Sequence, residues 1–195
     1  MKIYYDGLMD IDTFLAQRVR DLRKARGLTL EHLAEQSGVS RSMISLIERQ
    51  ETSPTAAVLN KLADAFGISL SALFAGGTPP KGDPVSRADE QPVWTDPASG
   101  YQRRHLSPTG LASAVDLVVV SFPPGETVVF ENPVRKANIQ QQMWMLEGTM
   151  QVTLGDQTCS LQKGDCMAMT LAARITFHNP GLTAARYLLA LTTTT

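Results

Sequence analysis

Cysteine and histidine are scarce in this sequence, and their scarcity excludes several kinds of site. The 195 residues include two cysteines, Cys159 and Cys166, too few for a disulfide framework and without nearby metal-ligating partners. The three histidines, His32, His105 and His178, are scattered, and by sequence evidence they build no nucleophile–base triad. We therefore predict no catalytic residues and no disulfide-stabilised fold.

Long hydrophobic runs are also missing. The longest strongly aliphatic run, residues 117–120, is far too short to span a bilayer. The first ten residues contain two aspartates and no apolar core segment, so they do not resemble a secretory signal. We expect a soluble cytoplasmic protein that makes no membrane contact.

The sequence has no large excess of either charge. Its net charge of −1 argues against a generally basic nucleic-acid binder. The charge is uneven, however, because residues 13–75 hold eight basic and six acidic residues, a balance of +2, and five of the basic ones lie between Arg18 and Arg26. Such a cluster can contact phosphates, although a solvated helix face has the same composition. The length suits one or two domains, and 43% hydrophobic residues is normal for a globular chain.

Residues 29–49, TLEHLAEQSGVSRSMISLIER, have the pattern of two short helices joined by a tight turn. Apolar residues recur at three-to-four spacing on each side of Gly38, where a left-handed backbone would end the first helix. Ser40 is a suitable N-cap for the second helix. The small Ala34, Gly38 four residues later and Ile44 six beyond that form the helix-turn-helix pattern. An ordinary small helical bundle is the alternative.

Polar side chains at the start of the second helix lie off its apolar stripe and would reach base edges and phosphates in a major groove. The amides at the two helix N-termini can also accept a phosphate. The predicted DNA-binding residues are Thr29, Ser40, Arg41, Ser42, Met43, Ser45 and Arg49.

Three further helices flank this pair. A first helix over residues 12–26 stops at Gly27. A fourth is expected to begin at Ser53-Pro54 and continue to Gly67, with proline at its first position, and Ser69 caps a fifth. We therefore predict an N-terminal arm over residues 1–12 and a five-helix domain over residues 13–75.

Residues 13–75 resemble the lambda-repressor-like (Xre-type) DNA-binding domain along its whole length. The resemblance implies a structural ion pair between Arg23 and Glu48 that fixes the angle of the recognition helix. The family often has glutamine at the position of Leu30, where this sequence departs from it. The resemblance also implies that the protein binds a two-fold double-stranded DNA operator as a dimer, because one recognition helix contacts too few bases for specificity.

The composition changes after the helices. Residues 76–92 are rich in glycine, proline and charge and are predicted to be a linker. From residue 93 to residue 195, short segments with period-2 alternation are separated by glycine, proline or aspartate, a pattern typical of a β-sandwich or barrel. The predicted strands are 101–106, 113–122, 126–131, 139–147, 149–154, 157–161, 165–169, 174–178 and 184–192. The predicted class is thus a multidomain chain, α followed by all-β.

The stretch WMLEGTMQVTLGDQTCSLQKGDCMAM resembles the centre of a cupin, a double-stranded β-helix or jelly-roll barrel, with turns at residues 146–148 and 164–165. PPGETVVF before it resembles the usual entry to the first cupin motif. The metal ligands of that family are missing at the matching positions. Its glutamate position is Gln141, its first two histidines would fall within residues 134–137, and its third histidine position is Ile175. The sequence therefore predicts no metal and no other cofactor.

A barrel without a metal can still hold a ligand. Strand parity places an apolar set with a few polar groups inside the barrel, the usual composition of a small-molecule site. The predicted ligand-binding residues are Phe130, Gln141, Met143, Met145, Met167, Met169, Ile175, Phe177 and Asn179. The alternative is that these residues only fill the core, methionine being a common gap-filler. Candidates to neutralise a carboxylate ligand are Arg103, Arg104, Arg135 and Lys136.

The sequence as a whole predicts a one-component transcription regulator and not an enzyme. Its effector would be a small organic molecule, such as an amino acid or related carboxylate, and its homodimer surface would include the outward-facing Gln142, Trp144 and Leu146. Two alternatives remain open. In the first alternative, the chain is an antitoxin-like DNA binder whose barrel serves only as a dimerisation or protein-interaction scaffold. In the second, the chain is a metal-free cupin enzyme with a tethered DNA-binding domain.

Overall fold

A computed structural model describes residues 10–74, 84–108, 113–131, 138–170 and 174–194. Most of the predicted N-terminal arm lies outside these ranges, as do Arg135, Lys136 and the predicted histidine positions of the cupin motif. No described helix is long and apolar enough to cross a membrane.

The N-terminal half of the chain is helical, as predicted. The described helices are α1 (Ile11–Ala25), α2 (Leu30–Ser37), α3 (Arg41–Glu48), α4 (Ala56–Ala65) and α5 (Leu70–Phe74). Gly38 ends α2 with a φ of 66°, a left-handed conformation that glycine adopts without steric cost. The Ser40 hydroxyl accepts a hydrogen bond from the amide of Met43 and so caps α3. The Thr29 hydroxyl accepts one from the amide of His32 and so caps α2. The helix-turn-helix therefore forms as the local pattern predicts.

The predicted start of the fourth helix at Ser53-Pro54 is wrong. Thr55 is the N-cap of α4, and its hydroxyl accepts a hydrogen bond from the amide of Val58. The first helical amide, that of Ala56, donates to the buried carboxylate of Asp96 at 2.9 Å. A carboxylate from 40 residues away in the sequence thus satisfies an amide at the start of α4.

The C-terminal half consists of two antiparallel sheets. The strands are β1 (Val93–Thr95), β2 (Gln102–His105), β3 (Val115–Phe122), β4 (Thr127–Phe130), β5 (Asn138–Glu147), β6 (Thr149–Leu154), β7 (Gln157–Gln162), β8 (Cys166–Thr170), β9 (Ile175–His178) and β10 (Ala185–Thr194). One sheet has the order β1-β2-β3-β10-β5-β8 and the other the order β4-β9-β6-β7. This is the expected cupin-like barrel. β1 is a short strand that the sequence did not predict.

Strand parity agrees with the alternation in the sequence. On β5 the side chains of Gln141, Met143 and Met145 are buried between the sheets, while Gln142 and Trp144 face outward. Period-2 alternation of this kind fixes the pairing register, because a shift by one residue would turn the apolar side chains out of the core.

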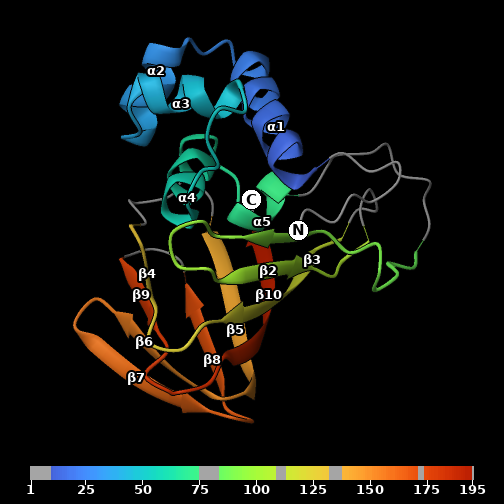
Figure 1. Ribbon diagram of the computed structural model, residues 1–195, viewed down its shortest axis with the longest axis vertical. Helices are drawn as coiled ribbons and strands as arrows, with labels where there is room; N and C mark the ends of the chain where they lie inside the picture. The colour runs from blue at the N-terminus through green and yellow to red at the C-terminus, as the bar shows by residue number, and fades with distance from the viewer. Residues whose placement is uncertain (1–9, 75–83, 109–112, 132–137, 171–173, 195) are drawn as a thin grey trace.

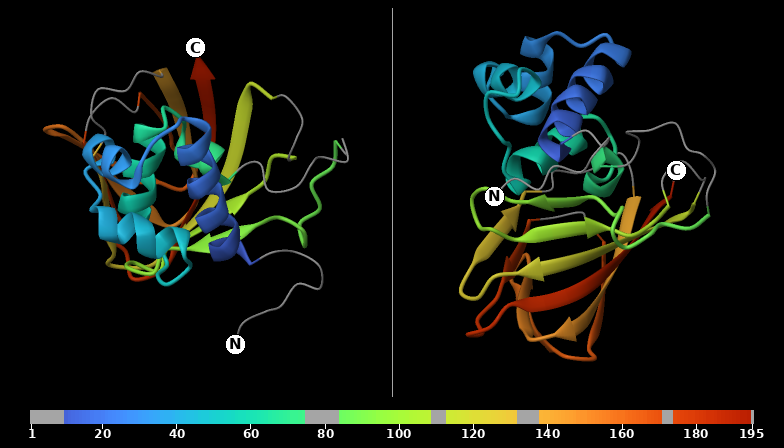
Figure 2. Two further views of the ribbon diagram at one scale, coloured as in Figure 1. Left: turned by 90° about the horizontal axis from the view of Figure 1, so that it is seen from above. Right: turned by 45° about the vertical axis from the view of Figure 1, so that its right-hand side comes forward.

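The helices pack on one end of the barrel (Figures 1 and 2). α4 and α5 lie nearest the strands, whereas α2 and α3 lie at the far end of the molecule. A run of aromatic rings crosses the junction, from Phe74 on α5 through Trp94 and Tyr101 to Phe122, with centroids 5.6, 6.0 and 5.6 Å apart. One continuous apolar core therefore includes residues of both halves.

Gly148 occupies the tight turn between β5 and β6, and we expect its substitution by alanine to destabilise the fold. Its φ is 73°, and a Cβ there would lie 2.9 Å from the Cα of Ala185. Left-handed backbone costs alanine about 1–2 kcal/mol, and crowding in a packed region adds about 1–3 kcal/mol. Urea denaturation would measure the loss. Gly155→Ala is the control, because Gly155 is left-handed but has open space around it; equal losses for the two variants would contradict the role of the close approach.

Candidate functional site

The predicted DNA-binding side chains lie at the end of the molecule farthest from the barrel. Arg41 and Ser42 begin α3 and are exposed, with 64% of the Arg41 side chain accessible. Ser45 is half-buried, and Met43 packs partly against the apolar core, so Met43 presents less surface than the other members of the set. Thr29, Ser40 and Arg49 are exposed. The start of α3 therefore offers a polar surface to a partner.

Exposed ion pairs occupy this surface. Arg41 pairs with Glu31 of α2, and Arg49 pairs with Glu51 at 3.2 Å. The backbone amide of Glu31 and then the charge of Arg41 lower the pKa of the Glu31 carboxyl. Exposed pairs contribute little to stability. The two arginines can therefore exchange these carboxylates for DNA phosphates at small cost.

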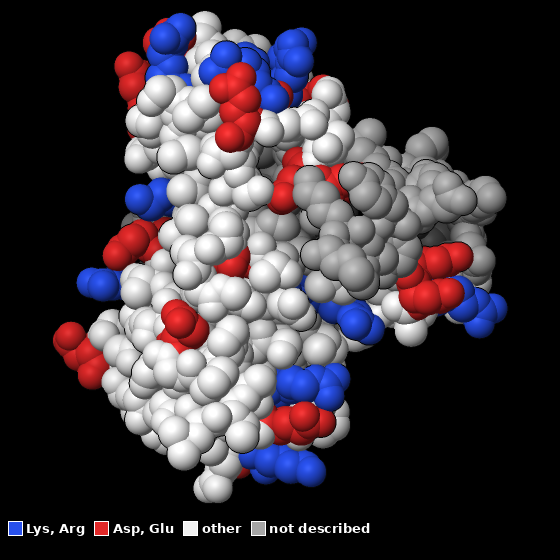
Figure 3. Space-filling model, viewed as in Figure 1, with Lys and Arg blue, Asp and Glu red and all other residues white. Residues whose placement is uncertain are grey.

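Charges of both signs gather at this end of the molecule (Figure 3). On the face shown, basic and acidic side chains alternate over the helical end, while much of the middle of the molecule carries neither. The surface is mixed in sign, so DNA affinity would depend on specific contacts near α3 more than on the net charge.

Arg23 and Glu48 form a bidentate ion pair that joins the end of α1 to the end of α3. Nε and Nη2 of Arg23 donate to the two carboxylate oxygens of Glu48 at 2.6 and 2.8 Å, and Nη1 donates to the carbonyl of Leu28 at 2.9 Å. The two side chains are only 14% and 8% exposed. The hydrogen bonds to Glu48 raise the pKa of Arg23. Because the fork is planar and fully engaged, it fixes the orientation of α3 on α1.

A cavity lies between the two sheets, at the end that the helices cover. It opens to solvent at its mouth. Its lining residues are Asn60, Leu70, Tyr101, Arg103, Phe122, Phe130, Gln141, Ile175, Phe177, Tyr187, Leu189 and Leu191. Helices α4 and α5 thus contribute to the wall together with the strands.

Four of the nine predicted ligand-binding residues line this cavity: Phe130, Gln141, Ile175 and Phe177. The structure places the other five elsewhere. Met143, Met145 and Met169 are buried in the barrel, Met167 is half-buried, and none of the four lines the cavity.

Asn179 also lies outside the cavity lining, although its strand parity is inward. Its amide nitrogen donates to the carbonyls of Phe122, Pro123 and Thr183, and its amide oxygen accepts from the amide of Gly181. The side chain is fully buried. In this structure Asn179 therefore cross-links backbone segments at the end of β9.

Several residues that line the cavity were not predicted from the sequence. Tyr187, Leu189 and Leu191 share one face of β10, and their period-2 spacing was a signal that could have identified them. No local signal identifies Asn60 and Leu70, because they reach the cavity only through the packing of the helices on the barrel.

The cavity combines an aromatic wall with a few polar groups. Phe177 contacts Phe130 edge to face at 5.9 Å and stacks on Tyr187 at 6.5 Å. Burial raises the pKa of Tyr101 and of Tyr187, so both hydroxyls stay protonated and can donate hydrogen bonds. An aromatic wall with few polar groups suits a small organic molecule.

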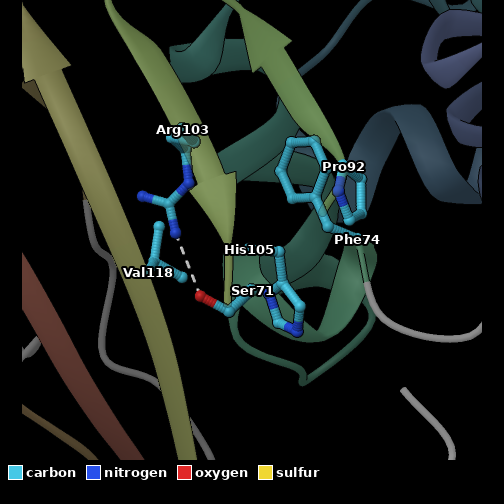
Figure 4. Close-up of a pocket in the computed structure, with 6 residues that line it drawn as sticks. All are labelled: Ser71, Phe74, Pro92, Arg103, His105 and Val118. Atoms are coloured by element: carbon cyan, nitrogen blue, oxygen red, sulfur yellow. Dashed lines mark hydrogen bonds between the residues drawn. The ribbon is translucent and has the colours of Figure 1, made fainter. Parts of the chain in front are cut away.

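A smaller pocket adjoins the cavity at the junction of the two halves (Figure 4). Ser71 and Phe74 of α5 face Arg103 and His105 of β2 there. The His105 Nδ1 atom is buried and has no hydrogen-bond partner among the described residues, and burial lowers its pKa. A neutral imidazole fits this apolar setting.

The residues present do not fit the divalent metal that many cupins bind. Ile175 has no donor atom, and Gln141 presents a neutral amide where a carboxylate would be needed. No group of three or more histidine, cysteine, aspartate or glutamate side chains that could hold a metal occurs in the described part of the chain. The donor atoms at these positions therefore do not form a cupin metal site.

Known proteins resemble this chain over its helical part and, in some cases, over nearly its whole length. A helix-turn-helix family model, HTH_3, matches residues 19–73. The chain is 40% identical over 78 residues to the HTH-type transcriptional regulator SutR of Escherichia coli (strain K12), a match that covers 38% of this chain and 44% of SutR, less than half of that relative's length. It is 25% identical over 179 residues to the HTH-type transcriptional regulator PuuR of the same strain, covering 92% of this chain and 95% of PuuR.

One solved structure shares the whole architecture. The crystal structure of an HTH_3 family transcriptional regulator from Vibrio cholerae superposes with a TM-score of 0.74 at 24% identity, covering 93% of this chain and 96% of that one. At this identity the similarity shows a common fold.

We expect Glu48→Ala to destabilise the protein by up to about 3 kcal/mol, the lower end of the cost of breaking a buried pair, since it leaves the part-buried Arg23 cation without its partner. Urea denaturation of the full chain would measure the change. Glu31→Ala is the control, because it removes a carboxylate from an exposed pair, and its midpoint should stay near that of the unsubstituted protein. Similar midpoints for both variants would show that the Arg23–Glu48 pair has no special structural role.

Proposed function

The chain belongs to the HTH_3 helix-turn-helix family, and from this premise we propose that it is a one-component transcription regulator that binds operator DNA through α3. The exposed N-terminal face of α3, held in place by the Arg23–Glu48 pair at the end of the molecule away from the barrel, carries this proposal. A helix that projects in this way can enter a major groove without a clash between the barrel and the duplex. The operator, and hence the working compartment of the protein, would be cytoplasmic.

The proposed DNA contacts divide by chemistry. Arg41, Ser42 and Ser45 are positioned for base edges or nearby phosphates, and Arg49 for the backbone. The capped N-termini of α2 and α3, at Thr29 and Ser40, present backbone amides to phosphate oxygens.

We place the homodimer interface on the outer face of the six-stranded sheet. The helices sit at one end of the barrel and leave that face free of helical cover (Figure 2). Trp144 is 48% exposed there, an unusual exposure for tryptophan, with Gln142 and Leu146 beside it on β5 and the half-buried Leu188 and Ala190 on β10. A half-exposed tryptophan within an apolar sheet face is a typical anchor for a second subunit. Two copies joined here would present two α3 helices to a two-fold operator.

The barrel is proposed to sense a small organic molecule and not to catalyse a reaction. Support comes from the cavity, whose lining offers aromatic and polar groups but no nucleophile–base pair and no metal ligands. A ligand there would alter DNA affinity only by its different affinity for the two arrangements of the helices on the barrel. The competing proposal, a barrel used only as a scaffold, predicts no specific ligand. An operator gel shift in the presence of candidate amino acids and carboxylates distinguishes the two proposals.

Arg41→Ala should weaken operator binding by about 1–3 kcal/mol if the guanidinium contacts a base edge. The fold should be unchanged, because the side chain is largely exposed. Fluorescence anisotropy with a promoter fragment would measure the loss. Arg174→Ala is the matched control, since Arg174 is equally exposed (64%) but lies in the β half. Equal affinities for the Arg41 and Arg174 variants would remove Arg41 from the DNA-binding surface.

Trp144→Arg should convert the dimer to a monomer, because it introduces a desolvated charge into each half of a symmetric interface. Sedimentation velocity would show the change in mass, and operator affinity should fall with it. Gln157→Arg, on an exposed position of β7, is the control. A Trp144 variant that remains dimeric would place the interface elsewhere.

A further inference from the structure

We propose that the cavity binds an organic anion whose carboxylate pairs with Arg103, at the contact between the helical half and the β half. This inference rests on the proposed ligand site and names its chemistry. The ligand would be bound mainly at the junction with α5, and not in the middle of the barrel where the alternation of the strand residues predicted the site.

Arg103 is a buried cation that forms no ion pair with any carboxylate of the described residues. The residue is 8% exposed and lines the cavity from β2. Its Nη2 donates to the hydroxyl of Ser71 on α5 at 3.0 Å, as Figure 4 shows, and within the described ranges no carboxylate forms an ion pair with it. A buried charge is costly unless an opposite charge accompanies it. The guanidinium therefore offers a binding position for a carboxylate, which it can bind through two parallel hydrogen bonds.

The Tyr101 hydroxyl is a second buried polar group at this cavity, and it lies beside Arg103. The residue is 2% exposed. Burial raises the pKa of Tyr101, and the charge of Arg103 together with hydrogen bonding from its side chain opposes that rise. The two side chains therefore lie close enough to approach one ligand oxygen from the same side. Arg103 and Tyr101 together can donate to the same carboxylate.

The rest of the cavity selects an organic anion over an inorganic one. Phe130, Phe177 and Ile175 form an apolar wall that an inorganic phosphate would leave unfilled. Gln141 adds one neutral amide that can bind a polar substituent. The matching ligand is a small carboxylate with an apolar or aromatic body.

The position of Arg103 connects such a ligand to the helices. Arg103 contacts Ser71 of α5, and Asn60 of α4 and Leu70 of α5 line the same cavity. A bound carboxylate would therefore touch the junction on which the placement of the helices depends. The affinity of the anion would be higher for the arrangement in which α5 contacts β2 than for arrangements in which the helices have moved on the barrel.

Isothermal titration calorimetry of the full chain tests the anion. The probes are phenylacetate and hexanoate, each compared with its own primary amide, which keeps the shape and removes the charge. We expect the acids to bind about 10- to 100-fold more tightly than the amides, the range of a charge-assisted hydrogen-bond pair. Amides that bind as tightly as the acids, or no binding of either acid, would overturn the proposal.

Two substitutions assign the effect to Arg103. Arg103→Gln should remove the preference for the acids, whereas Arg104→Gln, the same change on the outward face of the same strand, should leave it intact. Arg103→Met should maintain or raise the melting temperature of the ligand-free protein, because it removes an uncompensated buried cation. A lower melting temperature with unchanged acid binding would give Arg103 a structural role and overturn the proposal.

An operator gel shift with and without phenylacetate separates this inference from the proposed function. Acid binding that depends on Arg103 but leaves operator affinity unchanged would support the anion site and contradict ligand control of DNA binding. Intact operator binding by a protein that binds neither acid would overturn the anion site and leave the DNA-binding proposal standing.

Discussion

A row of aromatic rings joins α5 to β1, to Tyr101 just before β2, and to β3, and it holds the helices on the barrel. Phe74, Trp94, Tyr101 and Phe122 are all buried, and successive rings lie within 6.0 Å of one another. Rings of this size bury large apolar areas and restrict the angle at which two units can pack. Because of this junction, α4 and α5 close the cavity, the Asp96 carboxylate reaches the start of α4, and α3 faces away from the barrel.

Two arginines show how differently the molecule uses the same side chain. The part-buried guanidinium of Arg23 donates through all three of its nitrogens, to Glu48 and to the carbonyl of Leu28, an arrangement that holds one geometry. Arg103 donates to the hydroxyl of Ser71 and lies beside the hydroxyl of Tyr101, at the edge of a cavity. The first arrangement suits a fixed support for a DNA-binding helix. The second suits a site that is completed by a molecule from solution, and the proximity of Ser71 gives that molecule a route to affect the helices.

Local signals predicted the elements well, and long-range packing accounts for most of what they missed. Gly38, Ser40 and the alternation along β5 act within a few residues, so their consequences follow from the sequence. The start of α4 depends on a hydrogen bond to Asp96, which lies 40 residues away in the sequence. Part of the cavity wall comes from Asn60 and Leu70. No local sequence pattern identifies either of these long-range contacts. Strand parity correctly placed the methionines of β5 inside the barrel but could not distinguish a filled core from the lining of a cavity.

We propose above all that this chain recognises a two-fold DNA operator with a pair of α3 helices. Selection of bound sequences from a random duplex pool by the purified protein tests this proposal. We predict enrichment of an inverted repeat whose half-site centres lie about 10 base pairs apart, or a multiple of that distance, so that both helices enter major grooves on one face of the duplex. Enrichment of no sequence, or of a single half-site without its inverted copy, would show that the chain does not bind DNA in this way.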